Sequence, residues 1–237
     1  MVNNFRIGLP FFFFLISASS NAQVLISLLF GDALNTDKIE FGLTGGMNRS
    51  YLRDIPDSEG LNNFNLGFYF NILLLENAYL STGVLVKSNV GATGMATYPL
   101  GDEDFDGIFE DGMLTTKINY FYIPIMWQQR IRTRILLEGG LQAGLRTKAF
   151  DLFFVDSNGG ELEFEKELGD NYHRLDAGVV GGVGYKLKKD LKSTSLGFLY
   201  YHGLVDVNAA TSHKTRNSSL NIYLRIPIGA GEKKSKG

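Results

Sequence analysis

The sequence predicts an all-β protein: an exported, eight-stranded, antiparallel, up-and-down transmembrane β-barrel. Three observations lead to this prediction. Apolar and polar residues alternate with a period of two in runs of about ten residues, the length of a tilted membrane strand. Long and short connections between these runs alternate, as they do in outer-membrane barrels. The first residues have the form of an export signal.

The composition agrees with a β-rich protein and excludes several classes. The chain has 237 residues, with 28 Gly, 18 Phe and 11 Tyr but only 5 Pro and 1 Trp. Glycine and aromatic residues in this proportion are more typical of sheets than of helices. Because the chain has no cysteine, it can form neither disulfides nor thiolate metal sites. The formal charge of -2 gives no electrostatic basis for binding nucleic acid.

The N-terminal segment predicts a signal peptide over residues 1–22. Arg6 supplies the positive charge, the apolar run begins with Phe11–Ile16, and Ser20-Asn21-Ala22 has the small-x-small form of a cleavage site. The apolar run has roughly ten residues, whereas a membrane-spanning helix needs about 20. Residues 23–36 form a lead-in segment, either a periplasmic helix or a simple approach to the first strand.

The barrel is predicted over residues 37–229, and alternation identifies its eight strands. In the second of them, every other residue from Phe64 to Leu74 is apolar, and the residues between are Asn65, Gly67, Tyr69, Asn71 and Leu73. This spacing places the apolar side chains on one face of a strand and cannot form one face of a helix. The other seven strands are expected in KIEFGLTGGM, Tyr79–Asn89, TTKINYFYIPIMWQQ, RILLEGGLQAGLRTK, HRLDAGVVGGVGYK, TSLGFLYYHGL and SSLNIYLRIPI.

The connections between these strands fall into two classes. Long loops are expected at residues 48–62, 91–114, 149–172 and 203–217, and short turns near 76–77, 130–133 and 187–192. The second and third long loops hold thirteen of the 25 carboxylates, whereas Lys and Arg are frequent in the short turns and in a basic tail at 230–237. On this interpretation the acidic rim faces away from the cell.

The polarity of the two faces favours a membrane barrel over soluble alternatives. The polar face is rich in Gly, Asn, Arg and Glu, which suits a narrow and filled interior, and the large apolar face suits lipid. A soluble barrel would have the opposite arrangement. The alternative that remains is a secreted β-sandwich whose core uses the same apolar residues.

Five stretches also carry a family resemblance through their order and spacing: LLFGDALNTDKIEFGLTGGMN, YFYIPIMW, LDAGVVGGVGYK, YYHGLVDVN and SSLNIYLRIPI. The chain that contains them resembles the PorT-like outer-membrane β-barrel proteins of Gram-negative bacteria. This resemblance implies an eight-stranded, non-enzymatic barrel of mostly undefined role, with some members serving in secretion or surface assembly. The closing strand departs from the common outer-membrane ending, because no aromatic residue closes the chain and GEKKSKG follows.

The acidic stretch GDEDFDGIFEDG predicts a candidate calcium loop. In a twelve-residue calcium loop, Gly107 would stand at the sharp turn and Met113 at the position of the bidentate Glu. The alternative is a solvated acidic loop, which divalent ions could bridge to lipopolysaccharide phosphates. No cofactor other than calcium is predicted. The candidate metal ligands are Asp102, Asp104, Asp106, the carbonyl of Ile108, and Glu110.

The interior of the barrel is predicted to hold charged residues that pair into a plug, because buried charges need partners. A plugged lumen argues against an open diffusion pore. In the fourth strand, Pro124 predicts a local bulge or kink, since proline cannot donate to a strand ladder. The charged residues expected to face inward are Glu40, Lys87, Lys117, Arg134, Glu138, Arg146, Arg174, Asp176 and Arg225.

The expected function is a structural or interaction role rather than catalysis. The three histidines are His173, His202 and His213, and Leu204 stands where a serine would complete a motif with His202. An outer-membrane lipid-modifying enzyme remains the functional alternative. The expected partners are outer-membrane lipid, lipopolysaccharide and a protein that meets the loops or the periplasmic rim. The barrel is expected to be a monomer.

Overall fold

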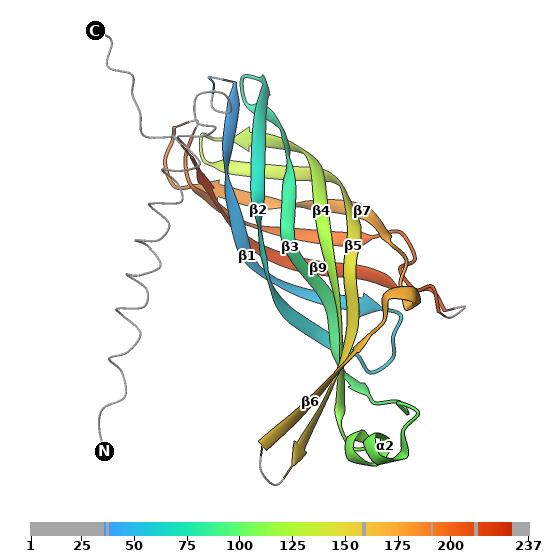
Figure 1. Ribbon diagram of the computed structural model, residues 1–237. Coiled ribbons are helices and arrows are strands. Elements are labelled where there is room, and N and C mark those ends of the chain that lie inside the picture. Colours follow the sequence, from blue (N-terminus) through green and yellow to red (C-terminus); the bar gives the residue numbers. More distant parts are fainter. Residues whose placement is uncertain (1–35, 37, 158–159, 191, 211–212, 229–237) are drawn as a thin grey trace, which may run out of the picture.

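The computed structural model describes residues 36, 38–157, 160–190, 192–210 and 213–228, which form a long barrel with a lobe at one end (Figure 1). The predicted signal peptide and tail, and all but Thr36 of the predicted lead-in, lie outside these residues. In chain order the elements are β1 (Ile39–Arg53), β2 (Glu59–Leu75), β3 (Ala78–Ala96), α2 (Glu103–Phe109), β4 (Met113–Ile131), β5 (Ile135–Ser157), β6 (Gly160–Glu167), η1 (Gly169–Asn171), β7 (Leu175–Lys186), β8 (Ser195–Gly203) and β9 (Arg216–Pro227).

Eight of these nine strands close into one antiparallel ring. The order of hydrogen-bonded neighbours is β4-β3-β2-β1-β9-β8-β7-β5, and β5 pairs again with β4. The ninth strand, β6, pairs with β5 beyond the ring. The predicted eight-stranded barrel is therefore confirmed. The β-sandwich alternative is wrong, because the strands form one closed sheet instead of two packed sheets.

The faces of the ring strands have the polarity that the sequence predicts. Large apolar side chains point outward and stay exposed, as Met47 at 64%, Leu141 at 62% and Ile125 at 56% show. At alternating positions, polar side chains such as Asn65 and Glu138 are buried in the interior. An apolar exterior around a polar interior is the arrangement of strands surrounded by lipid. Within the described part of the chain, no helix is long and apolar enough to cross a membrane.

The strands at one end of the barrel are longer than predicted. β1 and β2 leave only residues 54–58 between them, so most of the predicted loop 48–62 is strand. β5 has 23 residues and, with β6, takes up most of the predicted loop 149–172. The alternation of the sequence does not reveal these extensions, because strand residues outside the lipid need not be apolar on one face. We call this end the loop end and the other the short-turn end.

Two bulges change which side chains face the interior. The register of β3 against β4 shifts between Leu85 and Ser88, and the register of β4 against β5 shifts between Asn119 and Tyr120. An extra residue in one strand reverses the inward and outward alternation beyond it. The faces of β3 and β5 near the loop end therefore cannot be read by continuing the pattern from the short-turn end.

Pro124 does not produce the predicted bulge. The pairing of β4 with β5 keeps one register from Tyr120 to Ile131. Toward β3 the recorded pairs are Thr82 with Ile125 and then Leu85 with Tyr122, in the same register. Proline is tolerated where its missing N–H leaves no ladder bond broken. The Pro124 carbonyl still accepts a hydrogen bond, from the Thr82 hydroxyl at 2.9 Å.

A lobe stands away from the ring at the loop end (Figure 1). We define it as residues 97–114, which include α2, and residues 150–157 and 160–167, in which the end of β5 pairs with β6. Its core is a cluster of Phe109, Leu114 and Phe153, with Tyr98 and Phe164 packed against it. The lobe therefore has an apolar centre separate from the interior of the ring.

Candidate functional site

Two buried ion pairs cross the barrel interior near the short-turn end. Glu40 on β1 lies 3.5 Å from the Lys186 ammonium of β7, and Glu138 on β5 accepts a hydrogen bond from the Arg225 guanidinium of β9. All four residues are at most 7% exposed. Two acids and two bases, each from a different strand, therefore balance one another's charge, as buried ions require. We call these four residues the charged layer.

Neutral side chains complete the hydrogen bonding of the charged layer. Each of its carboxylates accepts two further hydrogen bonds, at 2.7 to 3.0 Å. Arg225 also lies over the Tyr223 ring, with 4.2 Å between the guanidinium carbon and the ring centroid. The neutral donors are Tyr69 and Asn71 to Glu40, and Gln128 and Tyr223 to Glu138.

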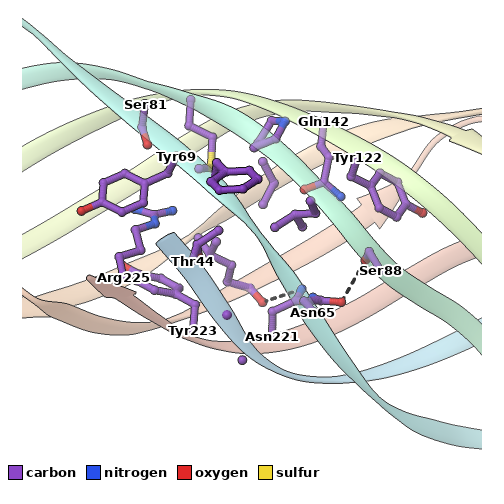
Figure 2. Close-up of a pocket in the computed structure, with 18 of the residues that line it drawn as sticks. Thr44, Asn65, Tyr69, Ser81, Ser88, Tyr122, Gln142, Asn221, Tyr223 and Arg225 are labelled. Carbon is purple, nitrogen blue, oxygen red and sulfur yellow. Dashed lines mark hydrogen bonds between the residues drawn. The ribbon is translucent and has the colours of Figure 1, made fainter. Parts of the chain in front are cut away.

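A cavity of about 50 Å³ lies between Arg225 of the charged layer and a set of amide side chains (Figure 2). Arg225, Tyr69 and Tyr223 line one side of it, and Asn65 and Ser88 line the other (Figure 2). A space of this size has room for on the order of a few water molecules. It is far smaller than the pockets of roughly 300 Å³ or more that hold small-molecule ligands.

Asn65 connects three other strands beside this cavity. Its side-chain oxygen accepts hydrogen bonds from the Asn48 amide at 2.5 Å and the Ser88 hydroxyl at 2.9 Å. Its amide nitrogen donates to Asn221 at 2.8 Å (Figure 2). Because these partners lie on β1, β3 and β9, this single side chain fixes the spacing of four strands across the lumen.

Asp176 on β7 forms the next polar contact toward the loop end. It is fully buried and accepts hydrogen bonds from the hydroxyls of Tyr122 and Tyr201 at 2.6 and 2.9 Å. The Asn217 amide donates a third, at 2.7 Å. This carboxylate is thus held by neutral donors, in contrast to the two carboxylates of the charged layer.

Apolar and aromatic side chains occupy the interior between Asp176 and the loop end. The buried cluster includes Leu52, Val90, Ile118, Tyr120 and Tyr201, each at most 1% exposed. They come from β1, β3, β4 and β8, so they meet across the lumen. Side chains from opposite strands therefore contact one another in this part of the lumen, as they do in the charged layer.

Four of the nine charged residues expected to face inward are buried in the interior. Glu40, Glu138 and Arg225 form ion pairs, and Asp176 is held as described. Arg146 is half-buried and pairs in register with Tyr120, whose side chain belongs to the interior cluster.

The expectation of an inward side chain is wrong for four residues. Lys87 is exposed because the bulge between Leu85 and Ser88 turns it outward, and Arg174 is exposed just before β7 begins. Lys117 lies between Thr116 and Ile118, both of which are buried. Arg134 lies at the rim, where it donates to the Tyr185 hydroxyl at 3.0 Å.

Lys186 is the interior residue that sequence reasoning missed. It is the last residue of β7 and directly precedes the short turn predicted at 187–192, yet it is buried and paired with Glu40. The signal was present in the alternation, because the inward series from Asp176 through Val180 continues with a period of two to Lys186. A charged residue at the last position of such a series is a candidate for the interior.

The predicted calcium loop is partly helical in the structure. Most of it lies in α2, and Asp106 donates its backbone N–H to the Asp102 carbonyl at 2.8 Å. The Asp106 carboxylate accepts the backbone N–H of Leu100. Ile108 and Glu110 are exposed, and the side chain of Asp104 is outside the described atoms. The described residues contain no group of three or more His, Cys, Asp or Glu placed to hold a metal.

Two carboxyl groups at the loop end have shifted pKa values. Burial raises the pKa of Asp151, and hydrogen bonds from Thr116 and Tyr98 offset part of the rise. For Asp206, slight desolvation raises the pKa, but the backbone N–H groups of Thr215 and Asn208, at 2.9 and 3.1 Å, bring it below its ordinary value. Asp151 therefore favours protonation in the folded protein, and Asp206 favours ionisation.

The three histidines lie at the loop end. A ring nitrogen of His202 is 3.3 Å from the Arg53 guanidinium, and its ring is 6.3 Å from that of Tyr200. His173 donates its backbone N–H to Val207 and is exposed, as is His213. The hydrogen bond from His173 to Val207 joins the segment before β7 to the segment after β8.

Comparison with known proteins identifies the class of this barrel. Residues 21–208 match the family model described as outer membrane protein beta-barrel domain. The chain therefore belongs to this family, and it is a protein of the bacterial outer membrane. No curated protein sequence matches it.

Solved outer-membrane barrels resemble the chain at low identity. The attachment invasion locus protein Ail of Yersinia pestis, in complex with the heparin analogue sucrose octasulfate, is 11% identical, with a TM-score of 0.44 over 79% of this chain and 97% of that one. Neisserial surface protein A is 11% identical, with a TM-score of 0.39 over 79% and 96%. OprG of Pseudomonas aeruginosa is 10% identical, with a TM-score of 0.33 over 80% and 93%.

Proposed function

We propose that this protein is a sealed, non-enzymatic, monomeric barrel that acts through binding at its loop end. The observation that carries the proposal is the sequence of side-chain contacts through the lumen. The charged layer, the Asn65 contacts, Asp176 and the apolar cluster follow one another from the short-turn end to the loop end. Such an interior acts as a plug against solute diffusion and leaves the outer surfaces for function.

The polarity of β6 supports a position of the lobe in water. Glu161, Glu163, Glu165 and Glu167 are exposed on one face of this strand, while Phe164 packs into the lobe core from the other face. This is the arrangement of a soluble protein, opposite to that of the ring. The acidic lobe then projects from the outer face of the membrane, where long loops of such barrels lie.

The lobe is the surface through which we expect a protein partner to bind. It has its own apolar core, which keeps its shape independent of the lipid, and it projects well beyond the ring (Figure 1). The resemblance to PorT-like proteins supports a role in secretion or surface assembly. A partner at the periplasmic rim is the competing arrangement.

Matched crosslinking positions separate these two arrangements. Leu162 in the lobe and Leu187 at the short-turn end are exposed to 46% and 47%, respectively. A photoreactive residue at each position, in intact cells, should give a protein adduct at Leu162 and none at Leu187. Adducts at Leu187 alone would place the partner at the periplasmic rim and overturn our assignment.

Conductance and protease access test the seal and the orientation. The purified barrel in a planar bilayer should show no steady ion current, and a steady current would contradict the plug. Protease added to intact cells should cleave the lobe. Protection of the lobe in intact cells, together with cleavage after the outer membrane is opened, would reverse the orientation.

Calcium binding at the acidic stretch stays a prediction. Ligands at alternating residues converge in a calcium loop, whereas on a helix successive alternating positions point in different directions. Binding would therefore require α2 to unwind. Calorimetry at millimolar calcium should show heat that Asp104→Ala removes, together with a loss of helical circular dichroism. If the wild-type barrel gives no heat, only the solvated loop remains.

A further inference from the structure

Three lysines form a patch on the outward face of the ring at the loop end. Lys87, Lys117 and Lys148 lie on the neighbouring strands β3, β4 and β5. Asn119 pairs directly with Lys148 on one side and with Asn89 on the other. Lys117 lies two residues from Asn119 on β4, and Lys87 lies two residues from Asn89 on β3, so the lysines surround this pair of asparagines.

The bulges of β3 and β5 bring these lysines to one face. Lys87 pairs with Leu66, an outward-facing residue of β2, because the register shifts just before Ser88. Lys148 pairs with Asn119, whereas Tyr120 pairs with Arg146, so Thr147 is the extra residue that turns Lys148 outward. Without the two bulges, Lys87 and Lys148 would point into the lumen.

The lysine patch has no acidic partner within the described residues. The salt bridges there join Glu40 to Lys186, Glu138 to Arg225 and Asp54 to Arg216. The acidic strand positions on the same face in this region are Glu59, which pairs with Thr93, Glu165, which pairs with Leu152, and Glu167, which lies level with Lys117. Glu167 is two strands away from Lys117, across Phe150, and no ion pair joins them. The positive charge of the patch is therefore available to a ligand.

The position of the patch fixes where that ligand must lie. Apolar side chains that face lipid continue directly below it, with Leu66, Phe121 and Leu145 exposed to 44%, 45% and 56%. Above it begins the acidic lobe. Lysines at such a boundary lay their apolar stems along the lipid and place their ammonium groups at the level of the headgroups.

We propose that Lys87, Lys117 and Lys148 bind the phosphate groups of a membrane-anchored anionic glycolipid in the leaflet at the loop end. Lysine binds phosphate as a point charge, and the Asn89 and Asn119 side chains can add neutral hydrogen bonds between the lysines. The proposal rests on the outward orientation of the loop end given above, because phosphorylated glycolipid fills the outer leaflet. The arginines on the opposite side of the ring are already engaged, as Arg53 is with Gly203 and His202.

The test compares a phosphorylated lipid with the same lipid lacking phosphate. The folded barrel in neutral detergent is mixed with equal amounts of lipid A and dephosphorylated lipid A, and retained lipid is counted by native mass spectrometry. The wild-type protein should retain the phosphorylated form roughly tenfold better, since each lysine near an anionic surface adds a severalfold preference. Replacing all three lysines with Gln should remove most of this preference.

A second lysine set provides the matched control. Lys188→Gln, Lys189→Gln and Lys192→Gln remove the same charge at the short-turn end and should leave the preference unchanged. Equal retention of both lipids by the wild-type protein, or an unchanged preference in the patch variant, would overturn the proposal. Displacement of the lipid by millimolar inorganic phosphate would show a free-phosphate site instead. If the triple variant does not fold, Lys117→Gln and Lys148→Gln alone should each lower the preference severalfold.

The assay is independent of the proposed function. Detergent has no sidedness, so lipid retention does not depend on which way the barrel faces. If the barrel does not retain the lipid and protease cleaves the lobe in intact cells, only the proposed lysine site is ruled out. Lipid binding together with a lobe that is protected in intact cells would overturn the orientation, and with it the glycolipid as the ligand in the cell, because that lipid lies in the outer leaflet.

Discussion

The ring and the lobe place polar and apolar side chains in opposite ways, although β5 runs through both. In the ring, β5 directs Leu137 and Leu141 outward and Glu138 inward. In the lobe, the same strand buries Phe153 while its partner β6 exposes a row of glutamates, Glu161 to Glu167. The polarity of the two faces of β5 reverses just past the bulge at Thr147. The ring therefore has the polarity that lipid requires, and the lobe has the opposite polarity, which is the one expected of a segment in water.

This difference also separates the sources of stability. The ring is held by a closed ladder of backbone hydrogen bonds and by buried polar contacts, and the lobe by burial of aromatic side chains. Changes to the charged layer should therefore weaken the ring, and changes to the aromatic cluster should weaken the lobe alone.

The largest effect is expected for Arg225→Met. The change leaves Glu138 buried without its cation, which typically costs about 3–5 kcal/mol. The free energy of unfolding in urea should fall by that amount, and heat-modifiable gel migration should shift to lower temperature. Arg216→Met, which removes a partly exposed arginine at the rim, is the control and should cost under about 1 kcal/mol. Equal losses in both variants would mean that the charged layer does not stabilise the ring.

The next effect is expected for Phe153→Ala. This side chain is fully buried in the lobe core, and such a truncation costs about 3–5 kcal/mol locally. Hydrogen exchange should accelerate in residues 97–114, 150–157 and 160–167, while the gel migration of the barrel stays unchanged. Phe153→Leu should have a smaller effect in the same segments. Destabilisation of the whole barrel by Phe153→Ala would show that the two regions unfold together.

A smaller effect is expected for Asp176→Asn. Tyr122 and Tyr201 donate to different carboxylate oxygens of Asp176, so the single amide oxygen can keep only the hydrogen bond from Tyr201. The new amide nitrogen, at the other position, can donate to the Tyr122 oxygen and, once the Asn217 amide rotates, to the Asn217 oxygen. That oxygen is buried and has no hydrogen-bond partner at present. The free energy of unfolding should change by about 1 kcal/mol or less. A loss as large as that of Arg225→Met would show that the charge of Asp176 is itself required.

The smallest effect is expected from the titration of Asp151. Because burial raises its folded pKa above the unfolded value, protonation favours the folded lobe. The stabilisation is fully present below the unfolded pKa and is lost as pH rises through the folded pKa. Hydrogen-exchange protection in the lobe should therefore rise as pH falls from neutral through the folded pKa of Asp151. Asp151→Asn should flatten this dependence, and an unchanged slope would contradict the assignment.

The ring was predictable because lipid imposes a strict alternation on its strands. The apolar series of β2 from Phe64 to Leu74 identified the outward face, and the tight turn at Glu76 and Asn77 separated β2 from β3. Three carboxylates of the interior, at Glu40, Glu138 and Asp176, were correctly placed by the same rule. Periodicity is informative here because a shift by one residue would expose polar side chains to lipid.

The remaining features depend on contacts that the alternation of the sequence does not reveal. The bulges that turn Lys87 and Lys148 outward follow from the pairing of strands distant in sequence. Helix α2 has seven residues, includes Gly107 and has no long amphipathic pattern. β6 resembled an acidic loop because its glutamates alternate with few apolar residues. Each of these features lies near or beyond the edge of the lipid.

The pairing of β1 with β9 sets the order of events in assembly. These two strands share twelve register pairs, from Gly42–Pro227 to Arg53–Arg216, across almost the whole described chain. Until β9 has been made, the edges of β1 and β8 have no neighbour, and unpaired backbone groups are costly in lipid. Insertion must therefore wait for the last strand or be aided by a protein that covers both edges. Without such a protein, the strands cannot insert into the membrane one at a time.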